Sequence, residues 1–225
     1  MKNRISVAID GPGGAGKSTA AKALAGRFGF AYVDTGAIYR TIGLAVLRAG
    51  GDPGEEAAVA PLLRSAQVGL DYDATGLQHM LLNGEDVTRE IRMPEISGYA
   101  SRVSALPTVR AALLELQREQ AAKRSVVMDG RDIGTVVLPD ATLKVFLTAD
   151  PRVRARRRWE ELRQRGTPQE FDEVFREMQE RDLRDSTRAA APLKPASDAV
   201  LLDSSDLSFE QVLAALSRLV EGVMS

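Results

Sequence analysis

The chain has 225 residues, of which 44% are hydrophobic and 27% charged, and its formal net charge at pH 7 is −1. This composition is typical of a soluble globular protein, and the near-neutral charge argues against a general surface for nucleic acid or membrane. Because the chain contains no cysteine, disulfides, thiolate metal sites and cysteine nucleophiles are excluded.

Strands and helices alternate in the first quarter of the chain. The apolar run RISVAID (residues 4–10) predicts a buried strand, and helix-favouring residues follow over 17–28. A second short strand, AYVD (31–34), leads into a helical stretch over 35–50. This alternation indicates an α/β fold.

The segment from 55 to 100 departs from this alternation. Between Val68 and Thr88, short strand-like runs are separated by turn signals, including Asn83-Gly84. Such a pattern is typical of antiparallel hairpins, so we expect a small subdomain inserted at 55–100.

The second half of the chain returns to the alternating pattern. Two helical segments precede SVVMDG (125–130) and TLKVFLTA (142–149), continuous apolar strands that suit the middle of a parallel sheet. Two charged helices over about 151–188, a strand at 199–203 and a helix from Ser208 complete the prediction. The serine and the glutamine three residues after it resemble a capping box.

The stretch GPGGAGKST connects the first predicted strand to the first helix. Its residues Gly11, Gly16, Lys17 and Ser18 fit the pattern G-x-x-x-x-G-K-[ST] of a phosphate-binding loop (P-loop). Glycines let backbone N–H groups turn towards an anion without a Cβ clash, and the helix N-terminus adds partial positive charge. In this pattern Lys17 would neutralise the β- and γ-phosphates and the Ser18 hydroxyl would ligate Mg²⁺. The motif predicts a site for the phosphates of a nucleoside triphosphate.

The P-loop alone does not choose between GTPases, ATP-driven motors and small-molecule kinases. The sequence contains no N-K-x-D motif for reading guanine, and no long apolar run ends in the paired acids of a hydrolytic ATPase. Arginines instead gather at the ends of predicted strands and on one helix face. These features favour a kinase with a second phosphorylated substrate. A kinase for another small acceptor and a nucleotide-binding switch that transfers no phosphate are the alternatives.

The helical segment 170–188 changes from apolar to charged along a single face. Its apolar residues at helical spacing are Phe171, Val174, Phe175 and Met178, and the same spacing continues to Arg181, Arg184, Asp185 and Arg188. A solvated surface would place its charges opposite the apolar face rather than in line with it. Buried arginines need an anion beside them, so contact with phosphate is favoured.

A second basic cluster, RVRARRR at 152–158, scatters around its helix instead of forming a stripe. It fits a solvated helix and, equally, a mobile lid that presents arginines to the donor phosphates and excludes water. Binding of nucleic acid is disfavoured because the sequence has no pattern of stacking aromatic residues.

Charged residues also cluster where the predicted strands end. DTGAIYR places Asp34 at a strand end and Arg40 beyond it, and DGRDIG ends another strand with Asp129, Arg131 and Asp132. Open α/β sheets bind their ligands at this edge. Asp129 could hold Mg²⁺ through a water molecule, and helix N-capping is the competing role for each of these aspartates.

The segments GPGGAGKST, DTGAIYR, ASRVSALPTVR, DGRDIGTVVLPDA and RDLRDSTRAAAPL together resemble the bacterial cytidylate kinases along nearly the whole chain. The resemblance implies a P-loop nucleoside monophosphate kinase fold, in which a five-stranded parallel sheet is flanked by helices. A small antiparallel β/α insert that binds the monophosphate and a helical lid complete that fold. The implied parts are a core of 1–54, 101–150 and 189–225, the insert at 55–100, and the lid with its adjoining helix at 151–188.

The same resemblance implies an enzyme of pyrimidine nucleotide metabolism. Its members transfer the γ-phosphoryl group of ATP to CMP or dCMP, giving CDP or dCDP and ADP, with Mg²⁺. The residues implied for ATP are Gly11, Gly13, Gly14, Ala15, Gly16, Lys17, Ser18, Thr19, Arg154 and Arg158. Those implied for the acceptor are Thr35, Arg40, Ser101, Arg110, Arg131, Asp132, Arg181, Asp185 and Arg188. The implied catalytic residues are Lys17, Arg131 and Arg188, and the implied metal residues are Ser18 and, through water, Asp129.

Within the acceptor set, the resemblance divides the roles by chemistry. Arg40, Arg131 and Arg188 would grip the CMP phosphate, Arg181 and Asp185 would contact the sugar, and Ser101, Arg110 and Asp132 would read the cytosine. Cytosine presents an N4 amino donor beside two acceptors, which a carboxylate and a guanidinium complement, whereas uracil presents O4 to the carboxylate. The family often has serine where this chain has Thr35, and the hydroxyl is retained.

CMP and dCMP are thus the expected partners, without nucleic acid or membrane. The N-terminal apolar run is too short for a signal sequence, and no window approaches the ~20 apolar residues that a membrane span requires, so we expect a cytoplasmic protein. No exposed apolar seam is evident, and we expect a monomer.

Overall fold

The computed structural model describes residues 4–224. They form two compact units, one of residues up to 30 together with 127 onward, and one of residues 31–126. The ends of the predicted core, residues 1–3 and 225, lie outside the described residues. Within the described part of the chain, no helix is long and apolar enough to cross a membrane.

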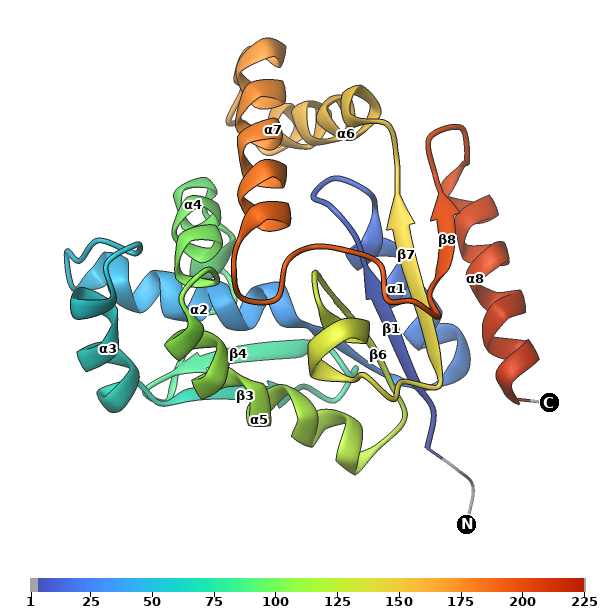
Figure 1. The fold of residues 1–225 in the computed structure, drawn as a ribbon, viewed down its shortest axis with the longest axis horizontal. Helices are drawn as coiled ribbons and strands as arrows, with labels where there is room; N and C mark the ends of the chain where they lie inside the picture. The colour runs from blue at the N-terminus through green and yellow to red at the C-terminus, as the bar shows by residue number, and fades with distance from the viewer. Residues whose placement is uncertain (1–3, 225) are drawn as a thin grey trace. The chain divides into compact units, whose positions relative to one another are not determined.

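The main sheet has five strands. Their order is β2 (Ala31–Asp34), β6 (Val126–Gly130), β1 (Ser6–Asp10), β7 (Leu143–Thr148) and β8 (Val200–Asp203) (Figure 1). β1 runs parallel to β7, with Val7 opposite Leu143, and β7 runs parallel to β8, with Val145 opposite Val200. The predicted five-stranded parallel sheet is confirmed, and the apolar runs are buried in β1, β6 and β7 as expected.

The helices of the first unit are α1 (Lys17–Phe28), η2 (Ile133–Val137), α6 (Pro151–Gln164), α7 (Phe171–Thr187) and α8 (Phe209–Met224). α1 packs against α8, and α6 packs against α7 (Figure 1). The predicted capping box of α8 is confirmed. The Ser208 N–H donates to Gln211 Oε1 at 2.8 Å, and the Gln211 N–H donates to Ser208 Oγ at 3.3 Å.

The second unit contains a separate sheet of three antiparallel strands, β3 (Val68–Tyr72), β4 (Gln78–Leu82) and β5 (Glu85–Asp86). β4 and β5 are joined by Asn83 and Gly84, whose φ angles are +54° and +84°. Two positive φ angles in a two-residue turn are the geometry that Asn-Gly favours. The antiparallel strands and the turn predicted here are therefore confirmed.

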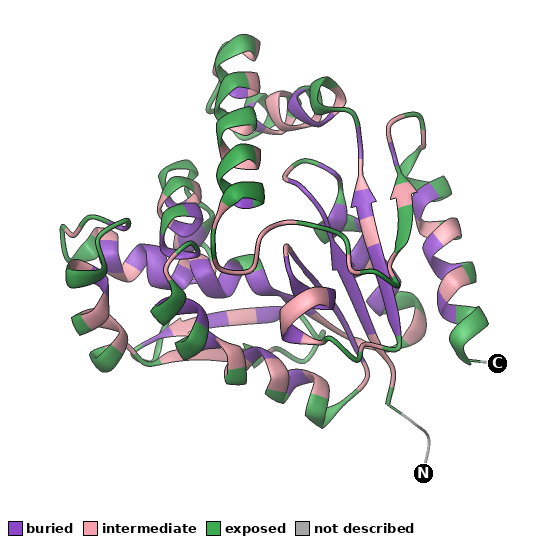
Figure 2. Ribbon diagram, in the orientation of Figure 1, coloured by how far each residue is buried: buried purple, intermediate pink, exposed green. Residues whose placement is uncertain are grey.

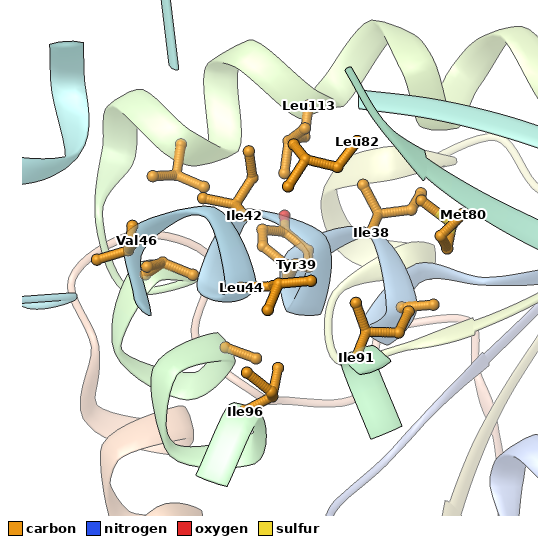
Figure 3. Packing of buried hydrophobic residues seen from close by; sticks show 14 of the residues in the cluster. Ile38, Tyr39, Ile42, Leu44, Val46, Met80, Leu82, Ile91, Ile96 and Leu113 are labelled. Atoms are coloured by element: carbon orange, nitrogen blue, oxygen red, sulfur yellow. The ribbon is translucent and has the colours of Figure 1, made fainter. Parts of the chain in front are cut away.

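The core of this unit surrounds α2 (Thr35–Arg48), which is buried along most of its length (Figure 2). The other helices are α3 (Glu56–Ser65), η1 (Glu90–Arg92), α4 (Pro94–Val103) and α5 (Pro107–Lys123). Ile38 and Ile42 of α2 belong to one apolar cluster with Leu82 and Leu113 (Figure 3). α2 and α4 approach closely because Gly43 has no side chain, and a Cβ there would lie 3.0 Å from the Ala100 nitrogen.

Two local features differ from the sequence prediction. The short π-helical turn η2 begins at Ile133, within DGRDIG, where the sequence predicts no helix. On α7, Val174 and Asp185 are buried, but Arg184 is exposed. The charged continuation of the apolar stripe is therefore narrower than expected, because Arg184 turns to solvent.

Candidate functional site

The P-loop connects the end of β1 to the start of α1, as its motif predicts. Gly11 has a φ of +147°, and a Cβ added there would lie 2.0 Å from the Leu147 carbonyl oxygen. Gly16 occupies the N-cap position of α1 with a φ of +86°. Both positions need glycine, since one faces the backbone of β7 and the other has a left-handed conformation. Gly13, Gly14, Ala15 and Thr19, also predicted for ATP, belong to the same loop and the first turn of α1.

Lys17 is the first residue of α1, at the point where the P-loop ends. Its side chain is buried, and Nζ donates a hydrogen bond to the Pro12 carbonyl oxygen at 2.7 Å. Burial, together with the positive charge of Arg131 and Arg181, lowers the pKa of Lys17 well below its ordinary value. Anionic phosphates would offset these positive charges and favour the charged form of the lysine.

Ser18 and Asp129 bring two oxygen atoms together beside the P-loop. The Ser18 hydroxyl donates to Asp129 Oδ2 at 2.8 Å, and Asp129 lies buried in β6. Mg²⁺ prefers oxygen ligands and is commonly held by one or two protein groups together with substrate phosphates. The chemistry of this donor pair fits Mg²⁺.

Arg131 forms an ion pair with Asp185 of α7, whose carboxylate is 5% exposed. Arg131 Nε lies 2.9 Å from Asp185 Oδ2, and Arg181 Nε lies 3.9 Å from the same oxygen. Burial would raise the pKa of Asp185, but the charges of Arg131 and Arg181 outweigh it and hold this pKa below its usual range. The carboxylate therefore stays ionised, accepts a hydrogen bond from Arg131 and lies beside Arg181.

Arg188 follows α7 and faces the segment after β6. Its Nε donates to the Ala191 carbonyl oxygen at 2.8 Å, and its Nη2 lies 3.5 Å from Asp132 Oδ1. Both charged side chains are 5% exposed. The first unit thus brings together five predicted acceptor residues, namely Arg131, Asp132, Arg181, Asp185 and Arg188, in the same unit as the P-loop.

Arg154 of α6 is buried and held by three groups. Its Nε donates to the Ala149 carbonyl oxygen at 2.9 Å, and its Nη1 lies 3.1 Å from the Gly13 carbonyl oxygen and 2.6 Å from Asp182 Oδ2. The basic cluster of 152–158 is therefore not uniformly solvated, because this arginine joins α6 to the P-loop and to α7.

Two further arginines of α6 differ in what they contact. Arg157 donates to the carbonyl oxygen of Ser204 at 2.6 Å, and the Ser204 hydroxyl lies 3.3 Å from the Ala15 carbonyl oxygen of the P-loop. Arg158, predicted to contact ATP, pairs with Glu161 at 2.9 Å on its own helix. Arg157 is thus linked to the P-loop through Ser204, whereas Arg158 remains near the surface.

In the second unit, Asp34 has a structural role as the N-cap of α2, which is the alternative to ligand binding. Its Oδ1 accepts a hydrogen bond from the Ala37 N–H at 2.9 Å and caps α2. Its Oδ2 accepts one from Arg92 Nη2 at 2.8 Å. Thr35, predicted for the acceptor, is the buried first residue of α2.

Arg40 extends from α2 towards η1 and α4. Its Nη1 donates to the Ile91 carbonyl oxygen at 3.2 Å, and its Nη2 donates to Ser97 Oγ at 2.9 Å. These two contacts fix the guanidinium group one turn of α4 away from Ser101.

Arg110 of α5 and Ser101 of α4 are linked through Ser104. Arg110 Nη1 donates to the Ser104 carbonyl oxygen at 3.1 Å, and the guanidinium carbon lies 5.5 Å from the centre of the Tyr39 ring. Ser104 Oγ donates to the Ser101 carbonyl oxygen at 2.9 Å. Among the described residues, the buried Ser101 hydroxyl has no hydrogen-bond partner. A buried polar atom without a partner is costly, and a ligand that supplies one would offset that cost.

Sequence reasoning did not identify three residues that shape these sites. Tyr39, which lies beneath Arg110, is part of the quoted motif DTGAIYR, so its position was a usable signal. Asp182 lies among many surface acids of α7, and nothing in the sequence marks it as the partner of Arg154. Asp10 ends the first strand, but its partners lie more than a hundred residues away.

Comparison with known proteins agrees with this geometry. The sequence profile of a family described as cytidylate kinase matches residues 7–222. Proteins named cytidylate kinase from Solibacter usitatus and Desulfitobacterium hafniense are 50% and 49% identical to this chain. The alignments cover 97% and 95% of this chain and 93% and 91% of those proteins. An uncharacterized protein from Eubacterium ventriosum has a similar structure, with a TM-score of 0.51 and 13% identity over 98% of this chain and 99% of its own. At that identity the likeness shows the fold alone.

Proposed function

Because this chain belongs to the cytidylate kinase family, whose members are phosphotransferases, we propose that it transfers the γ-phosphoryl group of ATP to CMP or dCMP. The products are ADP and CDP or dCDP. The observation that carries the proposal is the cluster of Arg131, Arg181 and Asp185, which lies in the same unit as the P-loop and Lys17. Such a concentration of cations suits a reaction in which two phosphate-bearing substrates meet.

The donor side of the reaction rests on the P-loop. Its backbone N–H groups and the N-terminus of α1 would hold the phosphates of ATP, and Lys17 would exchange the Pro12 carbonyl oxygen for a phosphate oxygen. Ser18, and Asp129 through a water molecule, would hold Mg²⁺, which supplies neutralisation of phosphate charge when it is bound. Arg154 and Arg158 remain predicted ATP residues within the proposed lid, 151–188.

The acceptor residues are assigned from the resemblance of the sequence motifs to the family. We assign Arg40, Arg131 and Arg188 to the phosphate of the monophosphate, and Arg181 and Asp185 to its sugar. The ion pair of Asp185 with Arg131 and its position beside Arg181 support this assignment. Thr35 is assigned to the acceptor as well, and the insert at 55–100 to the monophosphate-binding part.

Recognition of the base is assigned to Ser101, Arg110 and Asp132. The buried Ser101 hydroxyl, which has no partner among residues 4–224, supports a contact with ligand. Arg110 is held by a hydrogen bond to Ser104 and a cation–π contact with Tyr39. A fixed guanidinium and a carboxylate complement the acceptors and the amino donor of cytosine.

The transfer step needs no protein nucleophile. An oxygen of the acceptor phosphate forms a bond to the γ-phosphorus while the bond to the leaving ADP oxygen breaks, so no covalent enzyme intermediate arises. Lys17, Arg131 and Arg188 would stabilise the charge of the transferring group and align the two substrates. The cytoplasmic location, the monomeric state and the lack of nucleic-acid or membrane partners remain predictions from the sequence.

The first test is ADP release from ATP and Mg²⁺ with CMP, dCMP, UMP, AMP and GMP offered separately. Rapid release that depends on a cytidine nucleotide, with much slower release for the others, is the expected result. Preference for another acceptor would replace the substrate assignment. Release with none of the five would favour a switch, which should show nucleotide-dependent binding of a partner instead.

A further inference from the structure

Asp10 is a buried carboxylate that the proposed reaction does not use. It is the last residue of β1, directly before Gly11 of the P-loop, and it is 4% exposed. Its Oδ1 accepts a hydrogen bond from the Ile133 N–H and its Oδ2 one from the Gly134 N–H, both at 2.7 Å. Both oxygens of a carboxylate at the end of β1 are thus bonded to the turn that follows Asp132.

These two N–H groups lie at the start of η2, where a helical turn leaves its first donors without intrahelical partners. An aspartate in the N-cap position ordinarily accepts from them with its own carboxylate. Asp132 occupies that position with φ −148° and ψ 27°, but its side chain makes no capping hydrogen bond. Its Oδ1 lies beside Arg188 instead. Asp10, at the end of β1, therefore accepts the hydrogen bonds at the start of η2 that the Asp132 side chain would ordinarily accept.

The side chains around Gly134 leave little space beside the backbone of η2. A Cβ at Gly134 would lie 3.1 Å from Cδ of Lys144 and 3.4 Å from Asp10 Oδ2, so the backbone approaches both side chains closely. Lys144 Nζ is itself paired with Asp198 at 2.8 Å. Asp10 itself is acted on by the charges of Lys17 and Asp132.

We propose that Asp10 is a positioning residue, which fixes the backbone at Ile133 and Gly134 so that the Asp132 carboxylate serves the acceptor nucleotide instead of capping its own turn. The inference rests on the proposed function, in which Asp132 reads the acceptor base. Asp10 directly precedes the P-loop in the chain. It therefore connects the segment proposed for ATP to the segment that contains Asp132.

The variant Asp10→Asn tests the proposal, because the amide keeps the size of the side chain but turns an NH₂ group towards one of the two backbone N–H donors. We expect kcat/KM for CMP to fall by at least about tenfold, with a smaller CMP-to-UMP ratio, because a charged hydrogen bond is lost. The KM for ATP should change by less than about threefold, since the P-loop N–H groups are retained. Glu210→Gln on α8 is the control, because this exposed carboxylate, which accepts the Ser208 hydroxyl at 2.8 Å, belongs to no proposed site, and the variant should behave as wild type.

A double variant asks whether Asp10 acts through Asp132. If it does, adding Asp10→Asn to Asp132→Asn should leave the base selectivity of the Asp132→Asn enzyme unchanged. The same loss in both backgrounds would overturn the proposal, as would a wild-type kcat/KM for CMP in Asp10→Asn.

Hydrogen exchange of the Ile133 and Gly134 amides reports on the cap without reference to activity. Both amides should exchange faster in Asp10→Asn than in wild type, and unchanged exchange would contradict the proposal. A wild-type chain inactive with CMP would refute the proposed function, whereas the exchange result would still decide whether Asp10 anchors the turn. If Asp10→Asn fails to fold, Asp10→Ser, whose hydroxyl can accept from one N–H, provides the same comparisons.

Discussion

Arg154 Nη1 lies 2.6 Å from Asp182 Oδ2, and the same nitrogen lies 3.1 Å from the Gly13 carbonyl oxygen. One guanidinium group therefore joins α6 and α7 to the P-loop. The arginine side chain is 6% exposed and the aspartate 24%, so the pair is largely shielded from water. α7 also carries Arg181 and Asp185, which means that the same helix contacts the donor loop and bears proposed acceptor residues.

Replacing Asp182 with asparagine removes the counter-charge of this buried arginine. Because a buried charge without its partner is costly, we expect the free energy of unfolding to fall by about 1–3 kcal/mol. The KM for ATP should rise several-fold, since the Gly13 carbonyl loses a fixed donor. Urea unfolding and steady-state kinetics measure both effects.

The control for this prediction is Glu119→Gln on α5. Glu119 and Lys123 form an exposed pair at 3.3 Å, each side chain 58% exposed, and its loss should change stability by less than about 0.5 kcal/mol. Equal effects of the two substitutions would show that burial of the Arg154 pair does not matter.

Lys17→Met removes the charge of the P-loop lysine and keeps most of its volume in a buried position. Turnover should fall by at least about a thousandfold, because the transferring phosphoryl group loses a preorganised cation. Circular dichroism should remain that of the wild type. A folded Lys17→Met enzyme with near-normal kcat would contradict the assignment of Lys17 to the phosphates.

Asp132→Ala should damage the choice of base more than the chemistry of transfer. We expect the ratio of kcat/KM for CMP to that for UMP to fall by about 10- to 100-fold, since a specific polar contact to the base is lost. Competition assays with both nucleotides measure this ratio directly. Full discrimination against UMP in the folded variant would remove the base-reading role from Asp132.

Asp10 should make stability fall as pH rises. Burial raises the pKa of Asp10 to about 6, although its two backbone hydrogen bonds act in the opposite direction. The native state therefore holds this proton more tightly than the unfolded chain, and the residue's contribution to stability is full below pH ~4 and lost as pH approaches ~6.

Asp10→Asn abolishes this dependence. The free energy of unfolding of wild type minus that of the variant should decrease by up to about 3 kcal/mol between pH 4 and pH 7. Urea unfolding across this range is the measurement. Asp198→Asn is the contrast, because its pairing with Lys144 lowers the pKa of Asp198 and its contribution is lost as pH falls. A difference between wild type and Asp10→Asn that does not vary with pH would contradict the raised pKa.

Local patterns in the sequence predict much of this fold because they act over a few residues. Asn83-Gly84 specifies its hairpin through two positive φ angles, and Ser208 specifies the start of α8 through a contact three residues away. The P-loop is predictable for the same reason, since its glycines and Lys17 are read from one continuous stretch.

The sequence does not predict contacts that join distant segments. Asp10 and its partner Ile133 are 123 residues apart, and Arg154 and Asp182 are 28 apart. The turn η2 depends on a cap supplied from β1, so its own residues contain no sufficient signal for it. Helical spacing placed Arg184 in line with Arg181 and Asp185, but its side chain is exposed because the buried face of α7 is narrow near its end.

One edge strand of the main sheet is β8, a strand of four residues on which Leu201 is 67% exposed. An unpaired strand edge with exposed apolar side chains offers a template on which another chain can add, leading to aggregation. Here Asp198 lies just before the strand and Asp203 ends it, and the strand is shorter than most. The short strand and the Asp203 carboxylate at its end therefore limit the surface on which the edge of another chain could pair.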